Sequence, residues 1–500
     1  MINHYYPTLD VFKRLATRGN VVPVYRQLFA DTLTPVSAFQ KISNLKHPFL
    51  LESASGGEKI SRYSMIGFDP FYEFTVKGTT IEINQKKKEK ELFQSREPLR
   101  VLEKKMKEYI PVPVKDLPKF YFCAVGYIGY DAIRYYEYLP DMPSDDLMLP
   151  DIQVMFYDFL LIFDHFTRTI KIVCSSHIDG NDLKESYQHA VQRIDRVIEK
   201  LRTPVLYLSD DVATENESNL SYNTNFEVTD FLKSIESCKE YIRAGDIFQV
   251  VISQRFQTCT DADPFTIYRV LRVINPSPYM FYLKLDTLHL IGSSPEVMVK
   301  VDEGKVLVRP IAGTRRRGED DAEDEKLVGE LINDPKERAE HIMLLDLGRN
   351  DVGRVSRPGS VRITEEMVIE KYSHVMHITS SICGDLEEGK TAFDALEACL
   401  PAGTLSGAPK IRAMQIIDEL EPTKRGPYGG AVGYFDFFGN MNTCITIRTI
   451  LLNGKVAYVQ AGAGIVADSV PEKEYEETVN KAKGLLKAIE IAEKCEKDIS

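Results

Sequence analysis

Short segments in which apolar and polar residues alternate dominate the first 175 residues of the chain. Four of them stand at 49–53 (FLLES), 63–68 (YSMIGF), 72–78 (YEFTVKG) and 79–85 (TTIEINQ), separated by turn residues, and this pattern is typical of strands. The stretches VMFYDFLLIFDH and TIKIVCSS predict a hairpin. The segment DLKESYQHAVQRIDRVIEKL, which follows, predicts a helix.

The second half of the chain continues the mixture of helices and hairpins. The patterns predict a helix closed by Gly245, a helix capped by Asp334, and a terminal helix at 471–494, with hairpins at 279–294 and 297–311 and a strand meander at 429–464. Sequential antiparallel strands with helices outside predict an α+β fold, in which large antiparallel β-sheets form a sandwich-like core.

A polar segment that is poor in apolar residues lies near the middle of the chain and is the best linker candidate. Five hundred residues exceed one ordinary hydrophobic core, so we expect more than one structural part. The segment predicts an N-terminal part at 1–205, a linker at 206–226 and a C-terminal part at 227–500.

The composition narrows the class of function. A formal net charge of -12 argues against broad nucleic-acid binding, which needs a basic surface. No apolar run reaches the ~18 residues of a membrane span, and the first residues lack the layout of a signal peptide. The 8 cysteines contain no C-x-x-C pair, which disfavours a zinc or thioredoxin site. We therefore expect a cytoplasmic protein without a nucleic-acid or membrane partner.

Two pairs of carboxylates stand three residues apart on predicted helices: Glu337 with Glu340, and Glu474 with Glu477. Each pair shares one helix face. Acidic residues in a first turn also complement the helix dipole, so each pair alone favours that simpler interpretation. One carboxylate from each helix would make a minimal Mg²⁺ site if the two helices met.

Other candidate sites are weaker by themselves. Gly462 and Gly464 resemble a dinucleotide fingerprint, but only one helix follows, so they favour a glycine loop that approaches an anion at the terminal helix. His377 stands in a predicted strand, where a lone histidine is more often structural. The run RPIAGTRRRG at 309–318 is either a solvated loop or a local anion site.

Six ordered motifs together resemble the chorismate-utilising enzymes, and among them the anthranilate synthase component I branch. They are PIAGTRRRG, AEHIMLLDLGRNDVGRV, GTLSGAPKIRAMQIIDELEP, RGPYGGAVGYF, CITIRT and VQAGAGIVADSVPEKEYEET. The resemblance runs from about residue 20 to 490. It implies a lyase that converts chorismate and ammonia to anthranilate and pyruvate, the first committed step of tryptophan biosynthesis.

The resemblance also implies roles for single residues. Glu340 and Glu477 would hold Mg²⁺, Glu296 would be the general acid that helps the ring hydroxyl leave, and His377 would serve the elimination of pyruvate. The implied chorismate contacts are Gly313, Thr314, Thr404, Tyr428, Arg448, Gly462, Ala463 and Gly464. Arg315 to Arg317 would then be supporting or surface charges.

Two positions separate this chain from other branches of the family. Ala312 stands where aminodeoxychorismate synthases carry a nucleophilic lysine, and Gln249 stands where isochorismate and salicylate synthases carry a lysine base. Alanine has no nucleophile and glutamine cannot be that base, so ammonia itself is the expected attacking group. Aminodeoxychorismate synthase component I remains the alternative enzyme.

The N-terminal part would be regulatory and partner-binding, and 227–500 the catalytic part. The resemblance implies a tryptophan feedback site built from Glu52, Ser53, Asn275, Pro278, Tyr279, Met280 and Cys444. No segment looks like a glutaminase, so ammonia from glutamine would come from a separate amidotransferase subunit. A non-catalytic tryptophan-sensing subunit is the alternative from a different class of protein.

Overall fold

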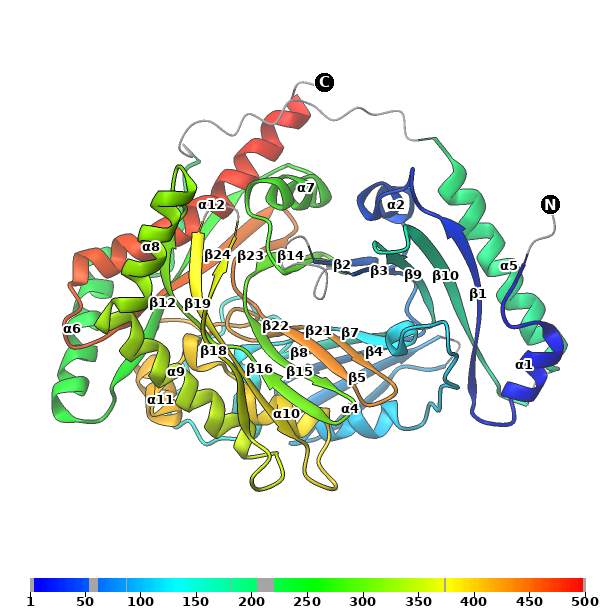
Figure 1. Cartoon of the computed structure of the whole chain (residues 1–500), viewed down its shortest axis with the longest axis horizontal. Coiled ribbons are helices and arrows are strands. Elements are labelled where there is room, and N and C mark those ends of the chain that lie inside the picture. The colour runs from blue at the N-terminus through cyan, green and yellow to red at the C-terminus, as the bar shows by residue number, and fades with distance from the viewer. Residues whose placement is uncertain are drawn as a thin grey trace.

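The computed structural model describes residues 4–53, 62–86, 88–180, 182–204, 220–372 and 375–497. Within these ranges the chain forms two 12-stranded sheets that face each other, with helices around them (Figure 1). The pairings within the two sheets are antiparallel, for example β1 (Val21–Phe29) with β10 (Thr169–His177). The predicted α+β fold with large antiparallel sheets is confirmed.

The first sheet joins strands from both ends of the chain. After β1 and β10 its spatial order is β9 (Phe159–Asp164), β3 (Tyr63–Gly67), β2 (Phe49–Glu52), β13 (Tyr279–Leu285), β14 (Leu288–Ser294), β23 (Thr449–Asn453), β24 (Val456–Ile465), β12 (Gln249–Cys259) and β11 (Asn223–Thr224), with β20 (Gly407–Ala408) also paired to β12.

The second sheet is built in the same way. Its order is β17 (Ile311–Arg316), β19 (Val375–Asp385), β16 (Lys305–Val308), β15 (Val297–Asp302), β22 (Met441–Ile445), β21 (Ala431–Asp436), β7 (Cys123–Ile128), β8 (Ile152–Tyr157), β4 (Tyr72–Lys77), β5 (Thr80–Gln85) and β6 (Glu91–Gln94), with β18 (Arg362–Lys371) also paired to β19.

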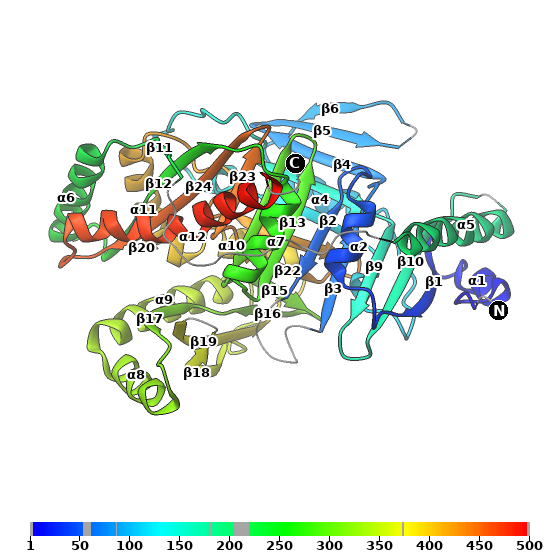
Figure 2. The same cartoon turned by 90° about the horizontal axis from the view of Figure 1, so that it is seen from above.

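Helices cover the outer faces of the sheets. One apolar cluster joins the first sheet to α1 (Leu9–Leu15), α2 (Pro35–Ile42), α5 (Leu183–Arg202), α7 (Pro264–Ile274) and α12 (Pro471–Lys497). Another joins the β12–β24 edge to α6 (Val228–Ala244) and α11 (Lys410–Leu420). Figure 2 shows α8 (Asp321–Asn333) and α9 (Pro335–Gly353) projecting with β17–β19 from the body.

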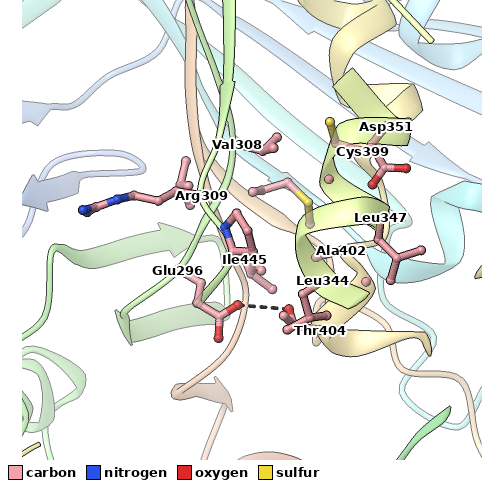
Figure 3. A pocket seen from close by; sticks show the side chains of 15 residues that line it. Glu296, Val308, Arg309, Leu344, Leu347, Asp351, Cys399, Ala402, Thr404 and Ile445 are labelled. Atoms are coloured by element: carbon pink, nitrogen blue, oxygen red, sulfur yellow. Dashed lines mark hydrogen bonds between the residues drawn. The ribbon is translucent and has the colours of Figure 1, made fainter. Parts of the chain in front are cut away.

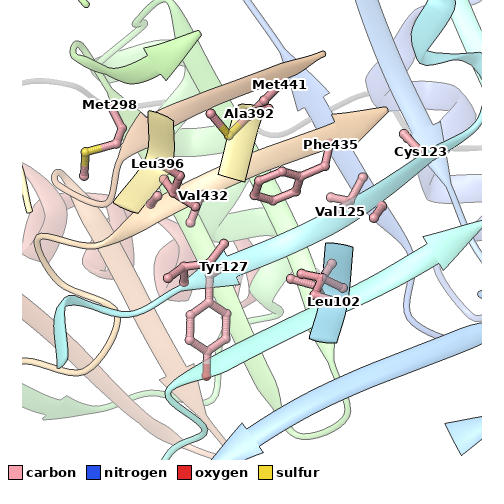
Figure 4. Packing of buried hydrophobic residues seen from close by; sticks show 14 of the residues in the cluster. Leu102, Cys123, Val125, Tyr127, Met298, Ala392, Leu396, Val432, Phe435 and Met441 are labelled. Carbon is pink, nitrogen blue, oxygen red and sulfur yellow. The ribbon is translucent and has the colours of Figure 1, made fainter. Parts of the chain in front are cut away.

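The main core fills the space between the sheets, because successive residues of a strand point to opposite faces. In β2, Phe49 belongs to the core between the sheets, whereas Leu50 belongs to the cluster under the helices. Helices α4 (Pro98–Met106) and α10 (Ala392–Cys399) add Leu102 and Leu396 to the same cluster, and Leu396 lies beside Val432 of β21 (Figure 4).

One predicted strand is in fact two. The stretch 154–165 was expected to be one arm of a hairpin, but Asp158 separates β8 of the second sheet from β9 of the first. Of these two strands, β9 pairs with β10, whereas β8 pairs with β7 and β4 of the second sheet. The Asp158 carboxylate at this crossing accepts bonds of 3.1 and 2.9 Å from the Arg193 guanidinium, a long-range contact that local patterns do not reveal.

Both sheets contain strands from each side of the expected linker at 206–226. Most of that segment lies outside the described residues, so the division at 205 and 227 stays a prediction. Within the described ranges, no helix combines the length and the apolar character that a membrane crossing requires.

Candidate functional site

Glu296 occupies the short connection between β14 and β15, where the chain passes from the first sheet to the second. Thr404, in the 3-10 turn η3 (Gly403–Leu405), donates its hydroxyl to Glu296 Oε2 at 3.0 Å. Figure 3 shows the two side chains pointing toward each other at one end of a pocket. The pocket is partly open to solvent and spans about 430 Å³, and Leu344, Leu347 and Cys399 belong to its walls.

Burial in this environment raises the pKa of Glu296 to about 7, and the Thr404 hydrogen bond opposes the rise. A carboxyl with that pKa is partly protonated near neutral pH, as a general acid needs to be. The positive charges of Lys481, on α12, and of Arg448, between β22 and β23, also lower the pKa of Glu296. The acid therefore stands beside two cations, an arrangement suited to an anionic ligand.

Lys481 lies among the candidate site residues, and the sequence did not predict it there. Its Nζ donates to the Gly462 carbonyl at 2.8 Å and pairs with Glu477 Oε1 at 2.6 Å. The Lys481 carbonyl accepts from Arg448 Nη1 at 3.1 Å. Its spacing of four residues from Glu477 was the one signal available, because such pairs share a helix face. The same spacing is common on solvated helices, so it is not specific.

The glycines at 462 and 464 lie in a strand, as the predicted meander at 429–464 requires, and not in the expected glycine loop. Gly462, Ala463 and Gly464 belong to β24 and lie opposite residues 251–253 of β12. A Cβ at Gly462 would approach the Tyr428 hydroxyl to 3.1 Å, and one at Gly464 would approach Gln249 Nε2 to 2.6 Å. The glycines therefore let two predicted site side chains lie close against the sheet, which is a common use of glycine in a strand.

The carboxylates of Glu340 on α9 and Glu477 on α12 act on each other. Burial raises the pKa of Glu340, and the negative charges of Glu337 and Glu477 raise it further. Gln249 Nε2 donates to Glu340 Oε1 at 3.2 Å, while Gln249 Oε1 is buried and finds no hydrogen-bond partner among the described residues. A cation would relieve the repulsion between these carboxylates.

This donor set fits Mg²⁺ better than a transition metal. Within the described residues, no group of three or more His, Cys, Asp and Glu side chains could hold a metal. Mg²⁺ keeps several waters and needs only one or two protein carboxylates. The predicted pair of ligands, Glu340 and Glu477, is therefore chemically suitable, and its role stays a prediction.

His377 lies opposite Thr314 where β19 pairs with β17. Its Nδ1 is 3.1 Å from the Gly313 carbonyl and 3.0 Å from Thr314 Oγ1. Because a carbonyl only accepts, the bond to Gly313 places the ring proton on Nδ1 and leaves Nε2 to accept one. Burial lowers the pKa of His377, which favours this neutral form.

The backbone around Gly313 requires a glycine at that position and sets the places of Ala312 and of the three arginines that follow. Gly313 has φ of +68° and interrupts the register between Ala312 and Thr314, a conformation that suits glycine. Ala312 is buried opposite Ile378. The three arginines that follow pair with carboxylates of the protein: Arg315 with Asp334 and Glu337, Arg316 with Glu323, and Arg317 with Asp324. They lie beside the predicted site as supporting charges.

The residues that the sequence predicts to bind tryptophan lie mainly around the start of β13. Glu52 faces Met280 across the β2–β13 pairing, and its Oε2 accepts from Tyr268 at 2.6 Å and Arg272 at 3.1 Å, both on α7. The Asn275 carbonyl, after α7, accepts from the Ser293 hydroxyl. The structure therefore supplies Glu52 with two partners that sequence reasoning did not find.

The other members of this set lie nearby. Pro278 immediately precedes β13, and Tyr279 donates to Asn442 Oδ1 at 3.3 Å. Burial raises the pKa of Tyr279, and Cys444 of β22 adds to the rise, so these two side chains are neighbours. Ser53 directly follows β2 and is the last described residue before 54–61, where the rest of the LLESASGG motif lies outside the described residues.

Comparison with known proteins agrees with the motifs. The sequence pattern of the chorismate binding enzyme family matches residues 46–487. An anthranilate synthase component 1 from Acetivibrio thermocellus is 50% identical over 498 residues, covering 98% of this chain and 99% of the relative.

Solved structures agree with the fold. Anthranilate synthase component I from Streptococcus pneumoniae TIGR4 superposes with a TM-score of 0.77 and 36% identity, over 92% of this chain and 99% of that one. The menaquinone-specific isochorismate synthase of Escherichia coli shares the fold at 17% identity, with a TM-score of 0.69 over 96% and 98% of the two chains. The chain therefore belongs to the chorismate binding enzyme family, together with the anthranilate synthase component 1 proteins.

Proposed function

We propose that this chain aminates chorismate with ammonia and releases pyruvate, forming anthranilate. The observation that carries the proposal is Glu296, a carboxyl with a pKa of about 7 set between a hydrogen-bonding threonine and two cations. Relatives of this length and similarity bear the name anthranilate synthase component 1.

The first step needs a nucleophile and an acid. Ammonia adds to the ring carbon adjacent to the one that bears the carboxylate, the double bonds shift, and the ring hydroxyl leaves as water with the proton of Glu296. The added nitrogen then gives up a proton, which restores the protonated Glu296. Hydroxide is a poor leaving group, which is why the acid is needed. Ala312 offers no competing nucleophile, and Gln249 is no base for activating water, so amination without a covalent enzyme intermediate is favoured.

The second step restores the aromatic ring. A base removes the ring proton at the aminated carbon, and the C–O bond at the adjacent ring carbon breaks, so that the enolpyruvyl group leaves as the enolate of pyruvate and then takes up a proton. His377 is suited to accept the proton, because its Nδ1 faces the Gly313 carbonyl and Nε2 is available. Chorismate plus ammonia thus balances anthranilate, pyruvate and water.

Binding requires two carboxylates of the substrate to be neutralised. Arg448, Lys481 and the backbone around Gly313 and Gly462 would hold chorismate, with Thr314 and Tyr428 beside it. Glu340 and Glu477 would hold Mg²⁺. When bound, Mg²⁺ supplies positive charge that polarises the conjugated ring carboxylate.

Regulation and partners complete the proposal. Tryptophan would bind near Glu52 and Met280, and its effect would reach the acid through β13 and β14, which pair Met280 with Ser293. Ammonia from glutamine would be delivered by a separate amidotransferase subunit, in the cytoplasm.

The test is anthranilate fluorescence from the purified chain with chorismate, Mg²⁺ and either ammonium or glutamine. We expect fluorescence and equimolar pyruvate with ammonium, and neither with glutamine until an amidotransferase subunit is added. An aminated product without pyruvate would favour aminodeoxychorismate synthase, and no product at all would favour a tryptophan sensor. Glutamine-dependent product from this chain alone would refute the separate partner.

A further inference from the structure

A buried ion pair outside the proposed reaction joins Arg425 and Glu421. Arg425 lies between α11 and β21 and is 2% exposed, and Glu421 is 5% exposed. Arg425 Nε donates to Glu421 Oε2 at 2.9 Å and Nη2 donates to Oε1 at 2.6 Å. Nothing in the proposed chemistry uses either charge.

The remaining contacts of Arg425 reach two other segments of the chain. Nη1 donates to the Leu405 carbonyl at 2.6 Å, and Nη2 donates to the Val251 carbonyl at 2.7 Å. Glu421 Oε1 accepts from both the backbone and the hydroxyl of Ser253, at 2.7 and 2.9 Å. One guanidinium thus ties η3 and β12 to the end of α11.

Each tied segment carries a group of the proposed site. Leu405 follows Thr404, whose hydroxyl donates to Glu296. Val251 stands two residues after Gln249, whose amide donates to Glu340. A displaced η3 would move the Thr404 hydroxyl away from the acid, and hydrogen bonds weaken steeply with distance and angle.

The flat face of the same guanidinium meets two aromatic rings. Arg425 Cζ lies 4.6 Å from the ring centre of Tyr130 and 5.8 Å from that of Tyr428. Tyr428 is the residue whose hydroxyl approaches Gly462. A cation over an aromatic face is attracted to it and fixes the plane of the ring.

We propose that Arg425 is a positioning residue for the amination, holding Thr404, Gln249 and Tyr428 in place around the substrate. The inference rests on the proposed function. Lysine cannot replace Arg425 in this role. Its single ammonium lacks the planar guanidinium that contacts two carbonyls, a carboxylate and two aromatic rings at once.

A purely stabilising role is the competing explanation, and a second, partly buried ion pair provides the control. Arg193 makes two bonds to Asp158 between β8 and β9, far along the chain from the site residues. Removing the fork of either arginine breaks a buried or partly buried pair, which is destabilising in both cases. Only the change at Arg425 should alter the behaviour of Glu296.

The experiment compares R425K, R193K, T404V and the double variant R425K/T404V. The readouts are kcat for anthranilate formation across pH at constant free ammonia, and the melting temperature. Glu296 is also faced by Lys481, Arg448, Tyr428 and Tyr372, none of which is changed. The midpoint of the alkaline limb of the pH–kcat profile then reports the pKa of Glu296 in each variant.

We expect R425K to lower kcat about tenfold or more and to move the alkaline midpoint up by about one pH unit, as T404V does, because the Thr404 bond opposes protonation. The two shifts should not add in the double variant. R193K should keep the wild-type midpoint.

Three results would overturn the inference: an unchanged midpoint in R425K, full additivity with T404V, or an equal shift in R193K. If R425K does not fold, E421Q keeps both carbonyl contacts of Arg425 while removing the ion pair. E421Q should lower the melting temperature and keep the wild-type midpoint of the alkaline limb. A shifted midpoint would contradict the proposal that Arg425 acts through its bonds to the Leu405 and Val251 carbonyls. A wild-type chain that forms no anthranilate would instead refute the proposed function.

Discussion

Replacing Thr404 by valine removes the hydrogen bond that the Thr404 hydroxyl donates to the carboxyl group of the proposed acid. Valine has nearly the same shape as threonine, so the wall of the pocket is preserved. The change removes the hydroxyl that lies 3.0 Å from Glu296 Oε2 and leaves Arg448 and Lys481 in place. The variant therefore alters the ionisation of Glu296 more than its packing.

The magnitude follows from the strength of that bond. A hydrogen bond to a charged group contributes ~1.5–3 kcal/mol, and ~1.4 kcal/mol corresponds to one pKa unit. Because the hydroxyl favours the ionised carboxylate, its loss should raise the pKa of Glu296 above about 7 by roughly one unit. The protonated acid then persists to higher pH, but it is a weaker and less well oriented donor, so the plateau rate should fall roughly three- to tenfold.

The assay is anthranilate fluorescence at saturating chorismate and Mg²⁺, with free ammonia held constant across the pH series. T404S is the control, since it keeps a hydroxyl and should keep the wild-type midpoint. An alkaline midpoint in T404V that is unchanged, or lower than in the wild type, would refute the assignment of Glu296 as the acid that Thr404 orients.

Three further predictions test the rest of the site. Glu340→Gln and Glu477→Gln should each weaken Mg²⁺ binding in calorimetry and reduce turnover at least a hundredfold, with an unchanged melting temperature. If either variant turned over at the wild-type rate at limiting Mg²⁺, the assignment of that ligand would be contradicted. Glu296→Gln should stop turnover yet raise the melting temperature at about pH 8 and not at about pH 4. Its folded pKa of about 7 exceeds the ordinary glutamate pKa of 4.5, so ionisation between these pH values costs the native state up to ~3 kcal/mol. Equal melting temperatures of the variant and the wild type at about pH 8 would count against this. Met280→Thr should weaken tryptophan binding and leave the chorismate KM near the wild-type value. Binding can be measured from the fluorescence of the ligand, because the chain contains 0 Trp. An unchanged affinity for tryptophan would show that the effector site is assigned to the wrong place.

Alternation along the chain was enough to predict most of the strands, because a strand between two apolar layers shows its period in the sequence. Phe49 and Leu50 illustrate this, since each enters a different core. The crossing at Asp158 could not be predicted, because an apolar run continues on both sides of it and its partner Arg193 lies 35 residues away. The predicted strand meander did extend to Gly464, but the interpretation of Gly462 and Gly464 as a loop was wrong, because these glycines make room for the side chains of a distant tyrosine and glutamine.

The structure brings several residues named by separate motifs into contact, whereas the residues that support them were not foreseen. Glu296 and Thr404 stand in separate motifs 108 residues apart, and only the structure shows their contact. Arg425 reaches Val251 across 174 residues. Such supports carry no local pattern, since a buried arginine in a turn looks like any surface arginine until the chain has folded around it.

The placement of the predicted effector residues suggests why a single chain would carry both binding and catalysis. β13 pairs with β2 on one side, bringing Met280 to Glu52, and with β14 on the other, bringing Met280 to Ser293. The Ser293 amide donates to the Arg448 carbonyl at 3.0 Å, and Glu296 follows three residues later. A ligand that shifts β13 would therefore move the acid and one of its cations together, provided that the ligand binds the two positions of the strand with different affinity. Linkage then requires chorismate to weaken tryptophan binding by the same factor, so a chorismate analogue that leaves tryptophan affinity unchanged would show that this strand pair does not couple the two sites.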